Sequence, residues 1–526
     1  MMQTIVRKET MKKASLILMF GALLVACGDD SESTNNANNG ENNVSNNDSN
    51  NDTTTNNGTT TNNGTAGTNN PAVCNQPEAS VYMFLNDDCQ DTVAYTGQVG
   101  RQVLVKDLSS YILSLEAQVD GGNFFPEEGD VVGALDFYFR FDGDASAEEM
   151  IRMSADPELL QTTYGFMGGG KDLVSKLAGN DSSTDHKDWS TEFEGWEDAT
   201  LAQYGGSIDT PEGMVQAIFA QVEKAAIDRA NGTFALDPVT GAELPLHVTA
   251  EGWDLQQLVE KFLHSSLSFS QGADDYLDDD VEGKGLLASN DGPDGDSPYT
   301  PLAHQWDEGF GYFGAARNYI DYTDDEIAQT GYRDTNEDGK IDLLTEYNFG
   351  ASTNAAKRDR GAAALGVTVD LTGDAWNAFR QGRALIASVE GPLTEAQLDE
   401  LRGYRDQAVL TWEKAYMATV LHYINDTLSE ISKFGSDDYN FVTYAKVWGE
   451  AKGFAFTPLY NRNSPLSEED YAELHRLLGD RPVSPAADTA EIDAYQEGLR
   501  TARQILADTY DFDQALIGGD NGEDGW

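Results

Sequence analysis

The sequence TEAQLDELRGYRDQAVLTWEKAYMATVLHYINDTL, residues 394–428, is the stretch that determines the fold class of this chain. Thr394 and Gln397 form a capping box, in which each side chain bonds the backbone amide of the other residue and a helix begins. Apolar residues then recur at helical spacing as far as Ile424 and Leu428. The stretch therefore predicts one long amphipathic helix.

Helical patterns also dominate the rest of the chain. Two later helices are predicted from their capping residues, one between Ser467 and Gly479 and one from Asp488 to about Tyr510. An earlier helix is predicted from apolar residues at helical spacing, namely Leu104, Leu108, Ile112 and Leu115.

Strand patterns are few. Residues 82–84 and 92–95 are rich in aromatic and β-branched residues, and a turn is predicted at residues 96–98. The predicted fold class is therefore mainly α, with a small N-terminal β element.

The first 27 residues predict a bacterial lipoprotein signal peptide. Lys12 and Lys13 precede a short apolar run that ends at Ala26, directly before Cys27. The run is too short to span a bilayer, which needs roughly 20 apolar residues. Because a cysteine at the cleavage point is the residue that lipidating enzymes modify, we predict a lipid on Cys27. This anchor would place the protein in the cell envelope, at the outer membrane, on the cell surface or in the periplasm.

Residues 28–72 consist almost entirely of Asn, Thr, Ser, Gly and Asp. Such a segment cannot bury enough apolar surface to offset its ordering entropy, so we expect a disordered tether. Cys74 and Cys89 follow it. In the oxidising surroundings of an exported protein, they are expected to form a disulfide that closes a short loop, with free thiols as the alternative.

The charge balance is strongly acidic. The chain has 34 Lys and Arg against 90 Asp and Glu, a formal net charge of −56. The electrostatic field of such a negative charge repels phosphate backbones and anionic lipid, so nucleic-acid binding is excluded. It attracts cations, although solubility in saline surroundings is a sufficient explanation for the charge as a whole.

Two pairs of similar motifs suggest an internal duplication. Glu260-Lys261, followed by Leu267, Phe269 and Gln271, resembles Glu413-Lys414, followed with a slip of one residue by Leu421, Tyr423 and Asn425. A second pair aligns without gaps: Trp306, Glu308, Gly311 and Tyr312 with Trp448, Glu450, Gly453 and Phe454. The repeat predicts two similar helical bundles, over residues 73–290 and 291–526, packed about a pseudo-twofold axis.

The first of these paired motifs has the composition of a metal half-site. Pro301 starts a helix, and His304 lies about one turn into it. His304 and Glu308, four residues apart, share one face, and Asp307 lies close by. Imidazole and carboxylate on adjacent turns suit iron or another transition metal, with Glu450 from the second motif as the other half. The alternative is a His–Glu hydrogen bond that only braces helices.

A second candidate metal site has the spacing of a calcium loop. Oxygen ligands occupy positions 1, 3, 5 and 9, a backbone carbonyl is available at position 7, and glycine stands at position 6. Position 12 is Thr345, but an acid follows it at Glu346. We therefore predict a structural calcium site over residues 334–346, with a solvated acidic turn as the alternative. The predicted ligands are Asp334, Asn336, Asp338, Lys340, Asp342 and Glu346.

Residues 274–282 form a dense run of carboxylates. Such a run is usually a solvated face, and the alternative is a patch that collects cations.

Several of these stretches resemble the imelysin-like group of bacterial envelope proteins, and most closely a lipoprotein family within it. The resemblance is carried by Val93-Ala94-Tyr95-Thr96-Gly97-Gln98 with Arg101, Tyr276 to Asp280, Gly283 to Leu287, His304 to Gly314, Tyr347 to Gly350, Ala355 to Asp359, and Gly449 to Phe454. It implies two duplicated helical bundles, an envelope location, and a part in iron or other metal acquisition together with other envelope uptake components.

The leading hypothesis is a non-catalytic lipoprotein that binds a metal, or a metal-bearing ligand, between two helical halves. Imelysins carry Gly-x-His-x-x-Glu, whereas this chain has Leu302 for the glycine and Asp307 for the acid. An imelysin-type metallopeptidase, with Glu308 as general base, is therefore the alternative. An adhesion or glycan-binding module is the second alternative.

Overall fold

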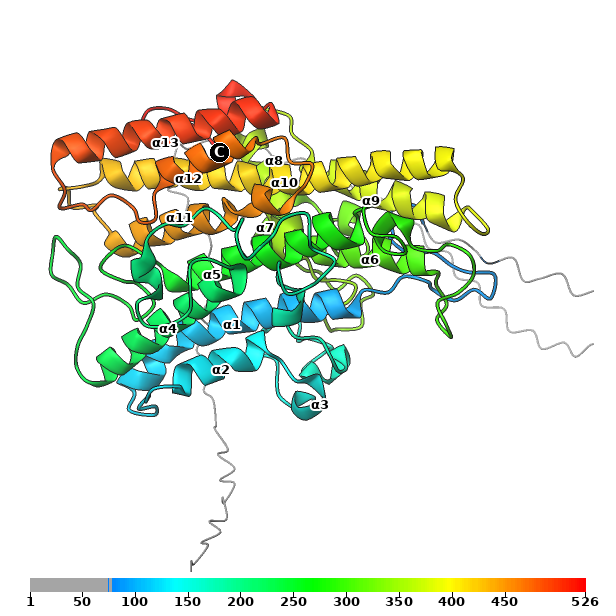
Figure 1. The fold of residues 1–526 in the computed structure, drawn as a ribbon, viewed down its shortest axis with the longest axis horizontal. Helices are drawn as coiled ribbons and strands as arrows, with labels where there is room; N and C mark the ends of the chain where they lie inside the picture. The colour runs from blue at the N-terminus through cyan, green and yellow to red at the C-terminus, as the bar shows by residue number, and fades with distance from the viewer. Residues whose placement is uncertain (1–73, 75–77) are drawn as a thin grey trace, which may run out of the picture. The chain divides into compact units, whose positions relative to one another are not determined.

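The computed structural model describes Cys74 and residues 78–526. The predicted signal peptide, Cys27 and the predicted tether lie outside these residues. The described part of the chain is mainly helical and contains thirteen α-helices and no β-strand (Figure 1). The predicted mainly α fold class is therefore confirmed.

The α-helices have the following bounds: α1 Thr96–Asp120, α2 Asp130–Phe139, α3 Gly143–Ser146, α4 Pro211–Ala230, α5 Leu255–Leu263, α6 Pro301–Phe313, α7 Asp324–Gln329, α8 Gly350–Ala364, α9 Leu371–Ala387, α10 Glu395–Ser432, α11 Phe441–Phe454, α12 Glu468–Leu478 and α13 Thr489–Tyr510. Two π-helices, η4 His264–Phe269 and η5 Gly272–Tyr276, continue α5. The 3-10 helices are η1 Tyr164–Met167, η2 Val174–Lys176, η3 Ala199–Ala202, η6 Gly285–Leu287, η7 Tyr319–Asp321, η8 Thr457–Tyr460 and η9 Gln514–Leu516.

The long helix predicted from residues 394–428 is α10, which has 38 residues. Both bonds of the capping box between Thr394 and Gln397 are present. Helix α10 packs against α8, α9, α11 and α13, so its apolar residues are covered on several sides (Figure 1). Packing contacts then run in series from α11 through α5 and α1 to α2 and α4.

The predicted boundaries of the last two helices are confirmed. Ser467 caps α12 by accepting the amide of Asp470, and α12 stops at Gly479. Asp488 caps α13, which ends at Tyr510.

The predicted N-terminal β element is wrong for the described residues. Leu85 and Asp91 form an isolated bridge in place of paired strands, and the predicted turn at residues 96–98 is the first turn of α1. The aromatic side chains of the segment dock on helices instead: the Tyr82 ring stacks on Phe310 of α6 at 3.9 Å. Cys74 and Cys89 form a disulfide at its start.

The paired tryptophan motifs lie on α6 and α11 and make similar contacts. The indole N–H of Trp306 donates to the Phe379 carbonyl at 2.8 Å, and that of Trp448 donates to the Leu478 carbonyl at 3.1 Å. Gly311 and Gly453 both lie against another helical segment, where a Cβ atom would lie 2.6 Å from its nearest neighbour. Cys74 and residues 78–526 belong to one compact unit, and duplication of its halves stays a prediction.

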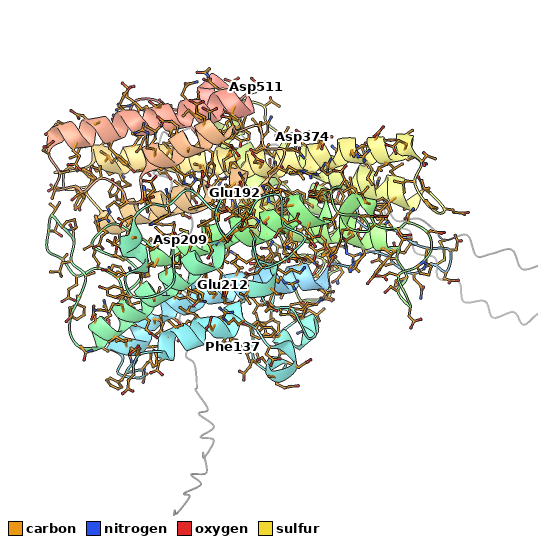
Figure 2. The ribbon with its side chains drawn as sticks, viewed as in Figure 1. Phe137, Glu192, Asp209, Glu212, Asp374 and Asp511 are labelled. Atoms are coloured by element: carbon orange, nitrogen blue, oxygen red, sulfur yellow. A yellow bond between two sulfur atoms is a disulfide. The ribbon has the colours of Figure 1, made fainter. Side chains whose placement is uncertain are left out.

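No helix in the described residues is long and apolar enough to cross a membrane. Acidic side chains come from many different elements, as the labelled Glu192, Asp209, Glu212, Asp374 and Asp511 show in Figure 2. All of these except Glu212 are exposed.

Candidate functional site

The three predicted metal ligands on α6 point to different surroundings. Asp307 is fully buried and accepts hydrogen bonds from Arg383 Nε at 2.9 Å and from the Tyr82 hydroxyl at 3.0 Å. Burial raises the pKa of Asp307, whereas Arg383 lowers it. The carboxylate is therefore part of an ion pair in the interior.

His304 and Glu308 lie on the other face of α6. The two groups are 3.8 Å apart between Nε2 and Oε2. His304 Nδ1 lies 3.1 Å from the Ala94 carbonyl, which can only accept, so Nδ1 is the donor. Glu308 Oε1 accepts from Gln98 Nε2 at 2.7 Å. At 3.8 Å the two groups form no hydrogen bond with each other, so neither the metal half-site nor the His–Glu hydrogen bond is observed in this pair.

Glu450 has partners of its own on α11. It accepts a hydrogen bond from the Tyr423 hydroxyl at 2.9 Å, and Lys261 Nζ lies 3.7 Å away. Across Cys74 and residues 78–526, no three His, Cys, Asp or Glu side chains are grouped so that they could hold one metal ion. The structure thus does not bring His304, Asp307, Glu308 and Glu450 together.

The predicted calcium loop is held by hydrogen bonds to its own backbone. The Asp334 carboxylate accepts from the amides of Asp338 and Gly339 at 3.2 and 2.9 Å. Asn336 Oδ1 accepts from the Asp338 amide at 2.9 Å, and Asp338 Oδ1 accepts from the Lys340 amide at 2.9 Å. The side chains at positions 1, 3 and 5 therefore organise the turn.

Glu346 joins the two ends of this loop. Its buried carboxylate accepts from the amides of Thr335 at 2.7 Å and Asp342 at 2.9 Å. Asp342 Oδ1 in turn accepts from Gln161 Nε2 at 2.7 Å. Glu346 therefore closes the loop from position 13, and calcium itself stays a prediction.

The π-helical segment of residues 264–276 contains a dense group of buried polar residues that sequence analysis missed. A π-helix has one more residue per turn than an α-helix, and such segments often mark functional sites. Nine polar residues of this segment and the turn after it are buried: His264, Ser265, Ser266, Ser268, Ser270, Gln271, Asp274, Asp275 and Asp278. A solvated face is therefore the wrong interpretation for these three acids of the carboxylate run.

Several side chains from α1, α6, η5 and the 171–181 segment meet beside this π-helical segment. We call them the central polar cluster, and its members are Arg101, Lys171, Lys176, Asp181, Asp275, Tyr276, Glu308 and Tyr312. Lys176 forms an ion pair with Asp181, and its ammonium lies 5.6 Å from the Tyr276 ring centre. The rings of Tyr276 and Tyr312 stack at 5.8 Å.

Asp275 is the least satisfied member of the central polar cluster. Its side chain is only 3% exposed, and neither carboxylate oxygen has a hydrogen-bond partner in the described part of the chain. Burial raises the pKa of Asp275 to about 6, although Lys284 and Lys176 act in the opposite direction. The Tyr312 hydroxyl is likewise buried and unpartnered there.

Two basic groups of the central polar cluster lie at the start of α1. A Cβ atom on Gly97 would lie 3.1 Å from Lys171 Nζ and 3.3 Å from Arg101 Nη1. Arg101 Nε donates to the Asp172 carbonyl at 2.8 Å. Burial, and secondly Arg101, lowers the pKa of Lys171.

Two other acids of the π-helical segment and the turn after it have basic partners, unlike Asp275. Asp274 Oδ2 lies 2.8 Å from His186 Nδ1, and His186 Nε2 lies 3.2 Å from the Leu459 carbonyl. Asp278 pairs with Arg462. Burial raises the pKa of both Asp274 and Asp278.

The fold and its site define an all-α protein with buried acids on a π-helical segment. Residues 181–409 of the chain match a known family, described as a domain of unknown function (DUF4856). The matched interval includes η4, η5, α6 and the predicted calcium loop, and therefore most of the central polar cluster. No curated protein and no solved structure matches the chain.

Proposed function

We propose that this protein is a non-catalytic binding protein of the cell envelope that holds a small charged solute at the central polar cluster. The observation that carries the proposal is the carboxylate of Asp275, buried with both oxygens unpartnered. Leaving a buried polar group unsatisfied costs about 1–3 kcal/mol, and more for a charged one. Such a group in a native structure therefore points to a bound water, ion or ligand.

The surroundings of Asp275 limit the kind of solute. Arg101, Lys171 and Lys176 balance the three carboxylates of the same cluster, so the cluster lacks the excess negative charge that favours a bare metal cation. A metal bound within an organic ligand, or another solute with anionic groups, meets these bases favourably. The proposal therefore keeps the ligand-binding hypothesis but moves the site away from His304, Asp307 and Glu450.

The envelope location in this proposal rests on the sequence of residues 1–27 and on Cys27. A role in metal acquisition, and membership of the imelysin-like group, rest on the resemblance alone. The metallopeptidase alternative is disfavoured, because Asp307 is held by Arg383 and Glu308 by Gln98. General-base catalysis needs a carboxylate within reach of an activated water.

Isothermal titration of the mature protein tests the proposal. The probes are ferric citrate, citrate, zinc, copper and the common L-amino acids, each added to unmodified protein and to Asp275→Asn. Exposed Asp437→Asn is the matched control. We expect at least one probe to bind, with affinity reduced at least tenfold by Asp275→Asn and unchanged in the control. Binding that is indifferent to Asp275, or no binding of any probe, contradicts the proposal.

A further inference from the structure

The first turn of α1 lacks a side-chain cap. Helix α1 has 25 residues, and its N-cap residue Tyr95 makes no side-chain bond to it. Within the described residues, the backbone amides of Thr96 and Gly97 donate to no acceptor. Uncapped amides and the helix dipole give this end a partial positive charge that favours an anion.

Lys171 adds a full positive charge at the same place. Its side chain is partly exposed, no hydrogen bond or ion pair joins its ammonium to another described residue, and the ammonium lies close to Gly97 and to Arg101. Gly97 makes this approach possible, because a Cβ atom there would lie 3.1 Å from Lys171 Nζ and 3.2 Å from its Cδ. Two cationic side chains and a helix terminus thus surround one point, and the carboxylate of Glu308 is their nearby negative charge.

Glu308 connects this place with an unpartnered acid, because it is among the charges that act on Lys171 and on Asp275. Asp275 has both oxygens buried without a partner. The buried Tyr312 hydroxyl, which can donate or accept, is also unpartnered in the described residues. Its electrostatic neighbours include Arg101, Glu308 and Asp275, so it belongs to the same site.

We propose that the central polar cluster binds a small zwitterion of the α-amino-acid type. The ligand carboxylate would lie against Lys171 and the first turn of α1, and the ligand ammonium against Asp275. This inference rests on the proposed function, because it names the class of solute that the same site takes. A zwitterion supplies an anionic acceptor to Lys171 and cationic donors to Asp275, so each protein charge meets an opposite charge.

Titration with matched ligands tests the assignment. Each of the twenty common L-amino acids is titrated singly into the mature protein, and every one that binds is compared with the amine and the carboxylic acid that lack its other charge. For alanine these analogues are ethylamine and propionate. We expect both analogues to bind at least tenfold more weakly than the amino acid.

Variants test separately how the protein binds the carboxylate and the ammonium of the ligand. We expect Lys171→Met to weaken the amino acid at least tenfold and to leave the amine unchanged, and Asp275→Asn to weaken the amine and leave the carboxylic acid unchanged. Gly97→Ala, which crowds the Lys171 ammonium, should weaken the amino acid less than Lys171→Met does. Lys433→Met, which removes a lysine paired with Glu430 outside the central polar cluster, should leave binding unchanged.

Other outcomes distinguish this inference from the proposed function. Amines or metal chelates that bind alone, with dependence on Asp275, would overturn the zwitterion and leave the proposed function standing. If no probe binds, or Asp275→Asn leaves all binding intact, both proposals are wrong.

Discussion

Asp307 on α6 and Arg383 on α9 form an ion pair in the interior of the protein, with 2.9 Å between Oδ1 and Nε. Their side chains are 0% and 2% exposed, and the Tyr82 hydroxyl donates to the same oxygen. A predicted metal ligand is thus a structural residue that joins two helices and the N-terminal segment.

We expect Asp307→Ala to lower the free energy of unfolding by about 3–5 kcal/mol, because it leaves the Arg383 guanidinium buried without its counter-charge. Urea denaturation followed by circular dichroism measures the loss, with Asp437→Ala as an exposed control. The double variant Asp307→Leu/Arg383→Met should be more stable than either single variant. A variant Asp307→Ala as stable as the control would contradict the structural role.

The raised pKa of Asp275 predicts how stability changes with pH. Because its folded-state pKa of about 6 exceeds the ordinary value of 3.8 for an aspartate, the native state favours the protonated acid. The stabilising contribution is complete below about pH 4 and is lost as the pH rises through 6. Asp275→Asn should therefore stabilise the protein above pH 7 by roughly 3 kcal/mol and have little effect at pH 4.

Denaturation of the unmodified protein and of Asp275→Asn at pH 4, 5, 6 and 7 measures this effect. The quantity to compare is the difference between their free energies of unfolding at each pH. Buried Asp278 and Asp359 also have raised pKa values, and they titrate in both proteins. A difference that is constant with pH would show that Asp275 is ionised in the folded protein throughout this range.

Two glycines within helices provide a matched test of the packing between α6 and α9. A Cβ atom on Gly382 would lie 2.0 Å from the Trp306 ring, whereas one on Gly403 would meet nothing within 4 Å. We expect Gly382→Ala to destabilise the protein by about 1–3 kcal/mol or more. Gly403→Ala should stabilise it by about 0.5–1 kcal/mol. Thermal unfolding of both variants measures these changes. Equal effects of the two substitutions would mean that α6 and α9 do not approach so closely.

Calcium should stabilise the protein through the loop at residues 334–346. Calcium at one hundred times its dissociation constant would raise the free energy of unfolding by about 2.7 kcal/mol. We expect a higher melting temperature with calcium than with EDTA, and no such difference in Asp338→Ala, which removes the ligand at position 5. Asp437→Ala should respond to calcium like the unmodified protein. A calcium effect that survives in Asp338→Ala would place the ion elsewhere.

Local sequence was sufficient to predict α10, α12 and α13 with their ends, because helix ends depend on neighbours in the chain. The capping box of Thr394 and Gln397, the Ser467 cap and the stop at Gly479 each involve residues within a few positions of one another. The same reasoning failed at residues 82–95, where Tyr82 docks on Phe310, more than two hundred residues away. No sequence pattern within residues 82–95 predicts a contact with a residue so far along the chain.

The candidate site residues also fall into two groups, those whose arrangement follows from local sequence and those whose surroundings depend on tertiary contacts. The sequence alone determined that His304 and Glu308 share a face of one helix, because four residues make about one turn. Only the tertiary structure decided that Asp307 faces Arg383 and that Asp275 is buried. The reason is physical: burial and ion pairing depend on which helix packs against a face, and the contacts of α6 with α1, α9 and the π-helical segment join parts of the chain that are distant in sequence.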